Sequence, residues 1–260
     1  MRGLQPTRPE PMYRNDRLVI LDADGTTIDA FGAIDRTFSR HGMDIGPLER
    51  FQKRRNLFKY LGGVKEFPTN LRKQVAGIRR SRLIETLTDV YREEATLYPG
   101  MTALLRCLTE QPGVRVGIVT RNITREPEET LAHLFRRHGC DPQRLDFLVH
   151  LPLRTSKLPT FRVLRQRFEV NPARAYACGD EGGDYLAAVQ CGLYPFMVSY
   201  GFEGHDRLRL KYGVPEEVIA STPLELTHRL LHALGLLPAE GGAAAPLLTA
   251  SPASASEAPR

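Results

Sequence analysis

The stretch Leu18-Val-Ile-Leu-Asp22-Ala-Asp24-Gly25-Thr26-Thr27 decides how the rest of this chain can fold. Its first four residues are all apolar, which is typical of a strand buried on both faces of a parallel sheet. Asp22 and Asp24 follow at the carboxyl end of this strand, and Gly25 allows the backbone to turn away sharply. Ligands of open α/β sheets bind outside such strand ends. Because two neighbouring acids repel each other and lose solvation, a divalent cation would explain the pair.

Two simpler explanations account for the pair less well. A helix N-cap would explain one aspartate and leave the other without a role. A calcium loop also begins Asp-x-Asp, but it requires Gly at its sixth position and Glu at its twelfth. Counted from Asp22, those positions hold Thr27 and Ala33. A site for phosphoryl transfer is the favoured interpretation, and a chance match of so short a pattern stays open at this point.

The composition indicates one α/β domain with an insert. The chain has 260 residues, of which 25% are charged, and a formal net charge of +6. No apolar run approaches the roughly 18 residues of a membrane span, so we expect a cytoplasmic protein without membrane contact. The four cysteines, Cys107, Cys140, Cys178 and Cys191, have no Cys-x-x-Cys spacing, and free thiols are expected.

The predicted domain organisation follows from shifts in composition. Residues 1–16 contain three prolines and no apolar h-region, which indicates a flexible lead-in rather than a secretory signal. Residues 17–29 and 98–236 carry the strands and helices of an α/β core. Residues 30–97 have helical spacing and no clear strand, so they are predicted to form a helical insert. The Ala-, Pro- and Ser-rich residues 237–260 are predicted to be a disordered tail.

The insert is also basic, with 14 Lys and Arg against 8 Asp and Glu. A solvated helix face is the usual explanation of such a run, and attraction of an anionic substrate comes next. Nucleic-acid binding is the least favoured explanation, because Phe51, Phe58 and Tyr60 are better explained as helix core than as a stacking platform. We therefore expect no nucleic-acid partner, and the sequence leaves the oligomeric state open.

After the insert, apolar strands alternate with helices. Strands are predicted at residues 114–119, 147–150, 175–178 and 193–199. Helices are predicted at residues 101–110, 126–139, 161–168, 186–191 and 224–234. This alternation predicts a doubly wound parallel sheet.

Polar side chains follow the later strands. Thr120 offers a hydroxyl group, although a helix N-cap explains it equally well. Lys157 offers a positive charge, although a lone lysine is more often a surface residue. Asp180 and Asp184 form a second acidic cluster, and a single capping aspartate would not explain both. Since strand ends of a parallel sheet share one edge, these groups are expected near Asp22 and Asp24.

The order of these motifs resembles the haloacid dehalogenase superfamily, in its phosphoglycolate phosphatase-like branch with a helical (C1-type) cap. The motifs are Asp-x-Asp-Gly-Thr, a strand ending in Thr, a Lys, and Gly-Asp-x-x-x-Asp. The resemblance covers residues 17–234. It implies a Rossmann-like α/β core, with residues 30–97 as the cap domain.

The resemblance also implies a role for each residue. Asp22 matches the nucleophile that becomes an aspartyl phosphate, and Asp24 matches the general acid and base. Asp22, the backbone carbonyl of Asp24 and Asp180 match the Mg²⁺ ligands, and Asp184 matches a second acid that supports the metal or the lysine. Thr120 and Lys157 match the groups that hold the phosphoryl oxygens.

The sequence departs from the family pattern in three places. Thr27 stands where Leu is commoner, and Pro159 follows Lys157 by two places rather than one. Arg121 separates Thr120 from Asn122, where Asn commonly follows the hydroxyl residue directly. Arg121 and Asn122 are therefore candidates for the phosphate pocket together with Thr120 and Lys157, Arg121 as an additional cation.

The resulting prediction is a Mg²⁺-dependent phosphatase acting on a small, anionic phosphorylated metabolite. A phosphomutase of the same chemistry is the nearest alternative. A catalytically weak regulatory or binding member of the family is the alternative from another class, and the presence of all four motifs disfavours it.

Overall fold

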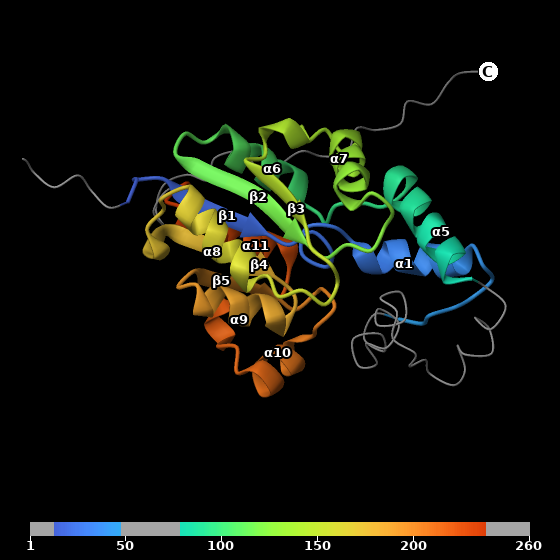
Figure 1. Cartoon of the computed structure of the whole chain (residues 1–260). Helices are drawn as coiled ribbons and strands as arrows, with labels where there is room; N and C mark the ends of the chain where they lie inside the picture. The colour runs from blue at the N-terminus through green and yellow to red at the C-terminus, as the bar shows by residue number, and fades with distance from the viewer. Residues whose placement is uncertain (1–12, 48–78, 238–260) are drawn as a thin grey trace, which may run out of the picture.

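The computed structural model describes residues 13–47 and 79–237 of the chain (Figure 1). Its centre is a six-stranded sheet in the order β3-β2-β1-β4-β5-β6, in which every neighbouring pair is parallel. The strands are β1 (Arg17–Leu21), β2 (Val114–Thr120), β3 (Phe147–His150), β4 (Ala175–Gly179), β5 (Tyr194–Val198) and β6 (Ile219–Ala220). The strand β1 lies inside the sheet between β2 and β4, so the residues that follow it emerge at the middle of the carboxyl edge.

Helices connect and cover the strands. The α-helices of the described residues are α1 (Ala30–Ser39), α5 (Arg80–Glu93), α6 (Met101–Glu110), α7 (Pro127–Arg137), α8 (Leu158–Arg167), α9 (Gly182–Gln190), α10 (His205–Tyr212) and α11 (Pro223–Ala233). Three short 3₁₀ turns stand at Pro142–Arg144, Pro172–Arg174 and Glu216–Val218. The doubly wound parallel sheet predicted from the sequence is therefore confirmed.

Both faces of β1 are buried, as its uninterrupted apolar run predicts. Val19 and Leu21 belong to a core that includes the inward residues of α6 and α11. Leu18 and Ile20 point the other way, into a second core under α8 and α9. Successive side chains of a strand point to opposite faces, so this short run holds both layers of helices on the sheet.

Several helix boundaries differ from the prediction. α8 begins at Leu158 rather than 161, and α9 begins at Gly182 rather than 186. Features of the helix ends mark these starts: a proline in the first turn of α8 and a Glu181–Asp184 capping box in α9. Asp184 thus lies in the first turn of a helix, not in the loop after β4. The helix α10 was not predicted, because it buries only Leu208 and shows no apolar periodicity.

The predicted helical insert is described only at its two ends. There the chain forms α1 and α5, which pack against each other, and α5 also contacts α7. Both helices lie beyond the carboxyl ends of the strands (Figure 1). Residues 48–78, which hold most of the basic run, lie outside the described residues, as do most of the predicted lead-in and tail. None of the described helices is both long and apolar enough to cross a membrane.

Candidate active site

Asp22 stands at the centre of the carboxyl edge of the sheet, directly after β1. Its own backbone N–H continues the pairing with β4 by donating to the carbonyl of Cys178 at 2.9 Å. The Thr27 hydroxyl donates to the Asp22 carbonyl at 2.7 Å, which closes the turn that follows. One carboxylate oxygen accepts from the N–H of Ala23 at 2.8 Å. Burial raises the pKa of Asp22 to about 7, against the opposing effect of Lys157.

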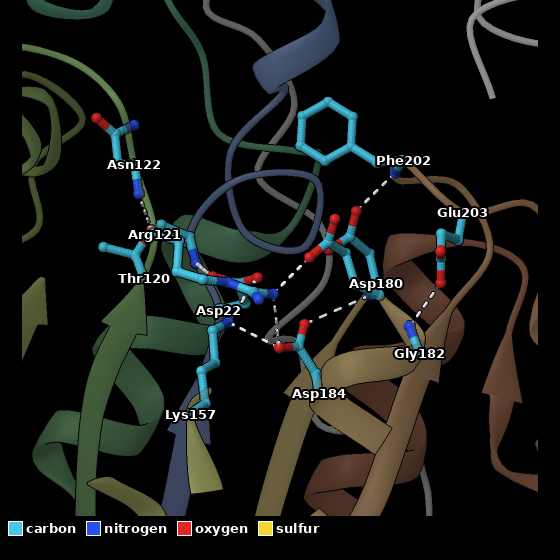
Figure 2. Close-up of polar contacts among 12 residues, drawn as sticks. Asp22, Thr120, Arg121, Asn122, Lys157, Asp180, Gly182, Asp184, Phe202 and Glu203 are labelled. Carbon is cyan, nitrogen blue, oxygen red and sulfur yellow. Dashed lines mark hydrogen bonds and ion pairs between the residues drawn. The ribbon is translucent and has the colours of Figure 1, made fainter. Parts of the chain in front are cut away.

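Lys157 bridges two acids from different parts of the chain, Asp22 directly after β1 and Asp184 in the first turn of α9. Its Nζ lies 2.8 Å from Oδ2 of Asp22 and 3.0 Å from Oδ1 of Asp184 (Figure 2). Only 2% of the residue is exposed, so the alternative of a surface lysine is excluded. Burial opposes its charge, but Asp184 and Asp22 raise the pKa of Lys157, and the ammonium form is held between them.

Asp180 is enclosed by backbone. Its Oδ2 accepts from the N–H of Phe202 at 2.6 Å. Gly25, with φ of +80°, lies so close that a Cβ there would come within 2.2 Å of the same oxygen. The Gly in Asp-x-Asp-Gly is therefore required both for the positive φ and for this close approach. Burial, followed by the nearby Asp22 charge, raises the pKa of Asp180 well above its ordinary value.

Asp184 and Arg121 lie within ion-pair distance of each other at the site. Arg121 forms an ion pair with Glu181, and its Nη2 also lies 3.4 Å from Oδ1 of Asp184. Although burial raises the pKa of Asp184, Lys157 and Arg121 together hold it below its ordinary value. The extra cation predicted from the sequence thus lies at the site, where it is paired with the acids of the fourth motif.

Asp24 has a different environment from the other acids. Tyr91 on α5 donates its hydroxyl to Oδ1 at 2.7 Å, and Nδ2 of Asn122 donates to Oδ1 and Oδ2 at 3.1 and 2.9 Å. The carboxylate therefore accepts from two distant segments and does not cap its own turn. Burial raises the pKa of Asp24 to about 6, and these hydrogen bonds oppose the rise.

Thr120 and Asn122 occupy the end of β2. Thr120 is buried, and its Oγ1 accepts from the N–H of Asn122 at 3.1 Å. Asn122 is oriented by Thr124, whose N–H donates to its Oδ1 at 2.9 Å, so its amide NH₂ group is directed at Asp24. Asn122 was predicted as a phosphate ligand, but its side chain is engaged with the Asp24 carboxylate.

The three acids Asp22, Asp180 and Asp184 fit a divalent cation. Each offers a carboxylate oxygen, and these oxygens lie within 4.8 Å of one another. In the part of the chain that the structure describes, Oδ1 of Asp180 is a buried oxygen with no hydrogen-bond partner. An unpaired buried carboxylate oxygen is costly, and hard oxygen ligands of this kind suit Mg²⁺. The carboxylate of Asp24 is not one of the three, so Asp24 could offer only its backbone carbonyl.

Some residues that build the site were not predicted. Tyr91 could not be found from spacing, because its approach to Asp24 depends on how the insert returns to the core. Glu181, Phe202 and Glu203 carried a usable signal, since Glu181 directly follows Asp180 and the other two follow the fifth predicted strand. The rule that strand ends share one edge, applied to β5 as well, would have found Phe202 and Glu203.

The fold and these side chains define a class of protein: a doubly wound α/β protein with acidic motifs at the ends of its strands. The sequence profile of the haloacid dehalogenase-like hydrolases matches residues 17–192. The chain belongs to this family, which confirms the resemblance drawn from the motifs. A search of curated proteins gives no significant match.

Solved structures show the same fold. A candidate phosphoglycolate phosphatase from Lactobacillus delbrueckii subsp. bulgaricus is 19% identical, with a TM-score of 0.56 over 82% of this chain and 98% of that one. A candidate β-phosphoglucomutase from Thermotoga maritima is 19% identical, with a TM-score of 0.57 over 83% and 99%. CbbY from Rhodobacter sphaeroides, solved in complex with phosphate, is 20% identical, with a TM-score of 0.56 over 81% and 96%. At such identities the likeness establishes the fold alone.

Proposed function

We propose that this chain is a Mg²⁺-dependent phosphatase that hydrolyses a small phosphorylated metabolite through an aspartyl-phosphate intermediate. The observation that carries the proposal is the buried Lys157 between Asp22 and Asp184, beside the unpaired oxygen of Asp180. In this proposal Asp22 is the nucleophile, Lys157 is a fixed cation and the neighbouring carboxylates are metal ligands, and all of them lie at the carboxyl edge of the sheet. Phosphoryl transfer needs such positioning and charge neutralisation above all.

In the first step, a carboxylate oxygen of Asp22 attacks phosphorus and the bond from phosphorus to the ester oxygen breaks. Asp24, in its carboxylic acid form, gives its proton to the leaving oxygen, so that an alcohol departs. The Asp24 side chain is held by hydrogen bonds from Tyr91 and Asn122, whereas the Asp22 side chain is paired with Lys157. The two carboxyl groups can therefore take different roles.

In the second step, Asp24 takes a proton from water and the resulting hydroxide attacks phosphorus. The bond between phosphorus and Asp22 breaks, which restores the Asp22 carboxylate and releases inorganic phosphate. Lys157 neutralises phosphoryl oxygens during both steps. Thr120 can donate its hydroxyl hydrogen to them while Oγ1 accepts from Asn122.

The metal would be held by Asp22, Asp180 and the backbone carbonyl of Asp24, with Asp184 supporting it and Lys157. When bound, Mg²⁺ neutralises charge on the phosphoryl group and on the crowded acids. Arg121 is assigned a place beside the phosphate-binding groups, where it offsets the charges of Glu181 and Asp184. The insert between β1 and the rest of the core is proposed to be the cap that covers the site.

Incubation with p-nitrophenyl phosphate, with and without Mg²⁺, tests the proposal. EDTA should abolish release of p-nitrophenol and Mg²⁺ in excess should restore it. Full turnover by a metal-free preparation would contradict the metal requirement, and no turnover with any metal would favour a regulatory member of the family. A panel of phosphorylated metabolites then identifies the substrate class.

A phosphomutase is the second candidate, because one structural neighbour is a candidate β-phosphoglucomutase. The two activities share the aspartyl phosphate and differ in what accepts the phosphoryl group. A phosphatase releases inorganic phosphate in step with substrate loss. A mutase converts one sugar phosphate into its isomer and leaves the total of esterified phosphate almost unchanged.

A further inference from the structure

The segment that follows β5 contacts the loop of the first motif, the metal-site residue Asp180 and the start of α9. The Tyr200 hydroxyl donates to the carbonyl of Thr26 at 3.0 Å, inside the loop of the first motif. The N–H of Phe202 donates to Oδ2 of Asp180. Glu203 accepts from the N–H of Gly182, at the start of α9, at 2.5 Å (Figure 2). Residues 200–203 thus connect the two acidic motifs.

Glu203 is an unusual member of this segment, because it is a fully buried acid with 0% exposure. One carboxylate oxygen accepts from Gly182 N–H, and the other accepts from Nε of Arg207 on α10 at 3.0 Å. A buried carboxylate carries a large desolvation penalty unless directional partners compensate it. Both oxygens of Glu203 have such a partner, and both partners fix the segment to the helices around it.

The position of this segment sets the space available to Asp180. A Cβ on Gly201 would lie 2.4 Å from Oδ2 of Asp180 and 2.4 Å from the carbonyl oxygen of Gly25. The Asp180 carboxylate is therefore enclosed between two glycine backbones and held by one N–H. Because Oδ2 accepts from Phe202, the buried Oδ1, which has no hydrogen-bond partner among the described residues, is the Asp180 oxygen that remains available to a metal.

We propose that Glu203 is a positioning residue for the metal: it holds residues 200–203 on the start of α9 and so keeps Asp180 oriented for a divalent cation. This inference rests on the proposed function, since it concerns the same metal site. Glu203 itself does not touch the metal or the substrate. Loss of an outer partner of a metal ligand typically weakens metal affinity by about 10–100-fold.

The test is the Mg²⁺ affinity of Glu203→Gln, measured in two ways. The first is the Mg²⁺ concentration that gives half-maximal p-nitrophenyl phosphate turnover. The second is the rise in Tm with added Mg²⁺, which requires no activity. The variant keeps the size of the side chain and one acceptor oxygen. We expect the variant to need at least about tenfold more Mg²⁺ than the unchanged protein for half-maximal activation. We expect kcat at saturating Mg²⁺ to change little.

Glu225→Gln is the matched control. Glu225 also accepts from a backbone N–H, that of Ser221, and also pairs with an arginine four residues on, Arg229. It lies on α11, outside the acidic cluster. The control should show the Mg²⁺ response of the unchanged protein, so a loss confined to Glu203→Gln supports a role at the metal rather than general stability.

A folded Glu203→Gln protein with unchanged Mg²⁺ affinity in both measurements overturns the inference. If Glu203→Gln does not fold, Arg207→Gln decides, because Arg207 is partly exposed and its loss removes one of the two hydrogen-bond partners of the same carboxylate. That variant should need several-fold more Mg²⁺, and an unchanged requirement overturns the inference. A wild-type protein without Mg²⁺-dependent turnover contradicts the proposed function instead, and the Tm measurement still tests Glu203.

Discussion

The hydroxyl of Tyr91 donates a 2.7 Å hydrogen bond to Oδ1 of Asp24, across 67 positions of the sequence. Tyr91 belongs to α5, the helix on which the insert returns to the core, and Asp24 belongs to the loop after β1. Both residues are buried. The hydrogen bond therefore ties the proposed acid and base to the end of the proposed cap.

Tyr91→Phe tests what this tie contributes. The substitution keeps the ring in the core and removes one donor from a carboxylate. We expect the free energy of unfolding to fall by about 1.5–3 kcal/mol, the usual range for a hydrogen bond to a charged group. We also expect kcat to fall more for an alkyl phosphate than for p-nitrophenyl phosphate, because only the alkyl ester depends strongly on proton donation by Asp24.

Tyr176→Phe is the control for this substitution. The Tyr176 hydroxyl donates to the carbonyl of Ala233 at 3.0 Å, and Tyr176 lies near the amino end of β4, away from the carboxyl edge that carries the site. Loss of this hydrogen bond should lower the free energy of unfolding by about 0.5–1.5 kcal/mol. It should leave kcat unchanged for both the alkyl phosphate and p-nitrophenyl phosphate. Equal kinetics for Tyr91→Phe and the unchanged protein would mean that Tyr91 contributes to stability alone.

The stability of the metal-free protein should depend on pH through Asp22 and Asp24. Burial raises their pKa values to about 7 and about 6 from an ordinary value of 3.8. The folded state therefore binds these protons more tightly than the unfolded chain does, and their contribution to stability falls as pH rises from about 4 to about 7. Mg²⁺ competes with the proton on Asp22, so the rise in Tm with Mg²⁺ should be larger at pH 8 than at pH 5. Equal rises at the two pH values would contradict Mg²⁺ binding at the Asp22 carboxylate.

The sequence predicted the groups at strand ends better than the contacts between them. The rule that parallel strands share a carboxyl edge placed Asp22, Thr120, Lys157 and Asp180 at one site from spacing alone. That rule gives no side-chain directions, so it did not show that Asn122 is directed at Asp24. Tyr91 was out of reach because its position depends on the packing of α5 against the core. Helix starts were the least predictable feature, since polar caps rather than apolar periodicity determine them.

Lys157→Met should lower stability, because it removes the ammonium group that lies between the carboxylates of Asp22 and Asp184. Without the ammonium group, Asp22 loses the cation it pairs with, and Arg121 is left as the cation beside Asp184. Loss of one partner from a buried ion pair typically costs about 3–5 kcal/mol. We expect urea unfolding in metal-free buffer to show this loss in the free energy of unfolding. With Mg²⁺ the loss should be smaller, because the charge of the metal replaces part of the positive charge of the lysine. Turnover should be almost abolished.

Lys211→Met is the control, because Lys211 is exposed and its Nζ lies 5.0 Å from the centroid of the Tyr212 ring. It should change neither turnover nor the dependence of stability on Mg²⁺. A Lys157→Met protein with the turnover of the unchanged enzyme would show that the phosphoryl group is neutralised by other residues, and Arg121 would be the first to test.

Asp24→Asn is the sharpest test of phosphate ester chemistry. An alcohol leaving group must be protonated as its bond to phosphorus breaks, and the amide cannot supply that proton. The fold and Mg²⁺ binding should persist, because the metal would use only the backbone carbonyl of Asp24. Turnover of alkyl phosphates should fall by about 10²–10⁴, the usual contribution of general acid–base catalysis. Asp89→Asn, on the exposed face of α5, is the matched control and should change neither turnover nor Mg²⁺ binding.

The leaving group separates the two roles of Asp24. p-Nitrophenolate leaves without a proton, so formation of the aspartyl phosphate on Asp22 should be only slightly slowed in Asp24→Asn. Hydrolysis of that intermediate should be slow, because no base activates the water. Rapid mixing should therefore show a burst of p-nitrophenol equal to the enzyme concentration, followed by slow turnover. If Asp24→Asn instead hydrolyses alkyl phosphates at the normal rate, Asp24 is not the acid, and the phosphatase proposal loses its main chemical support.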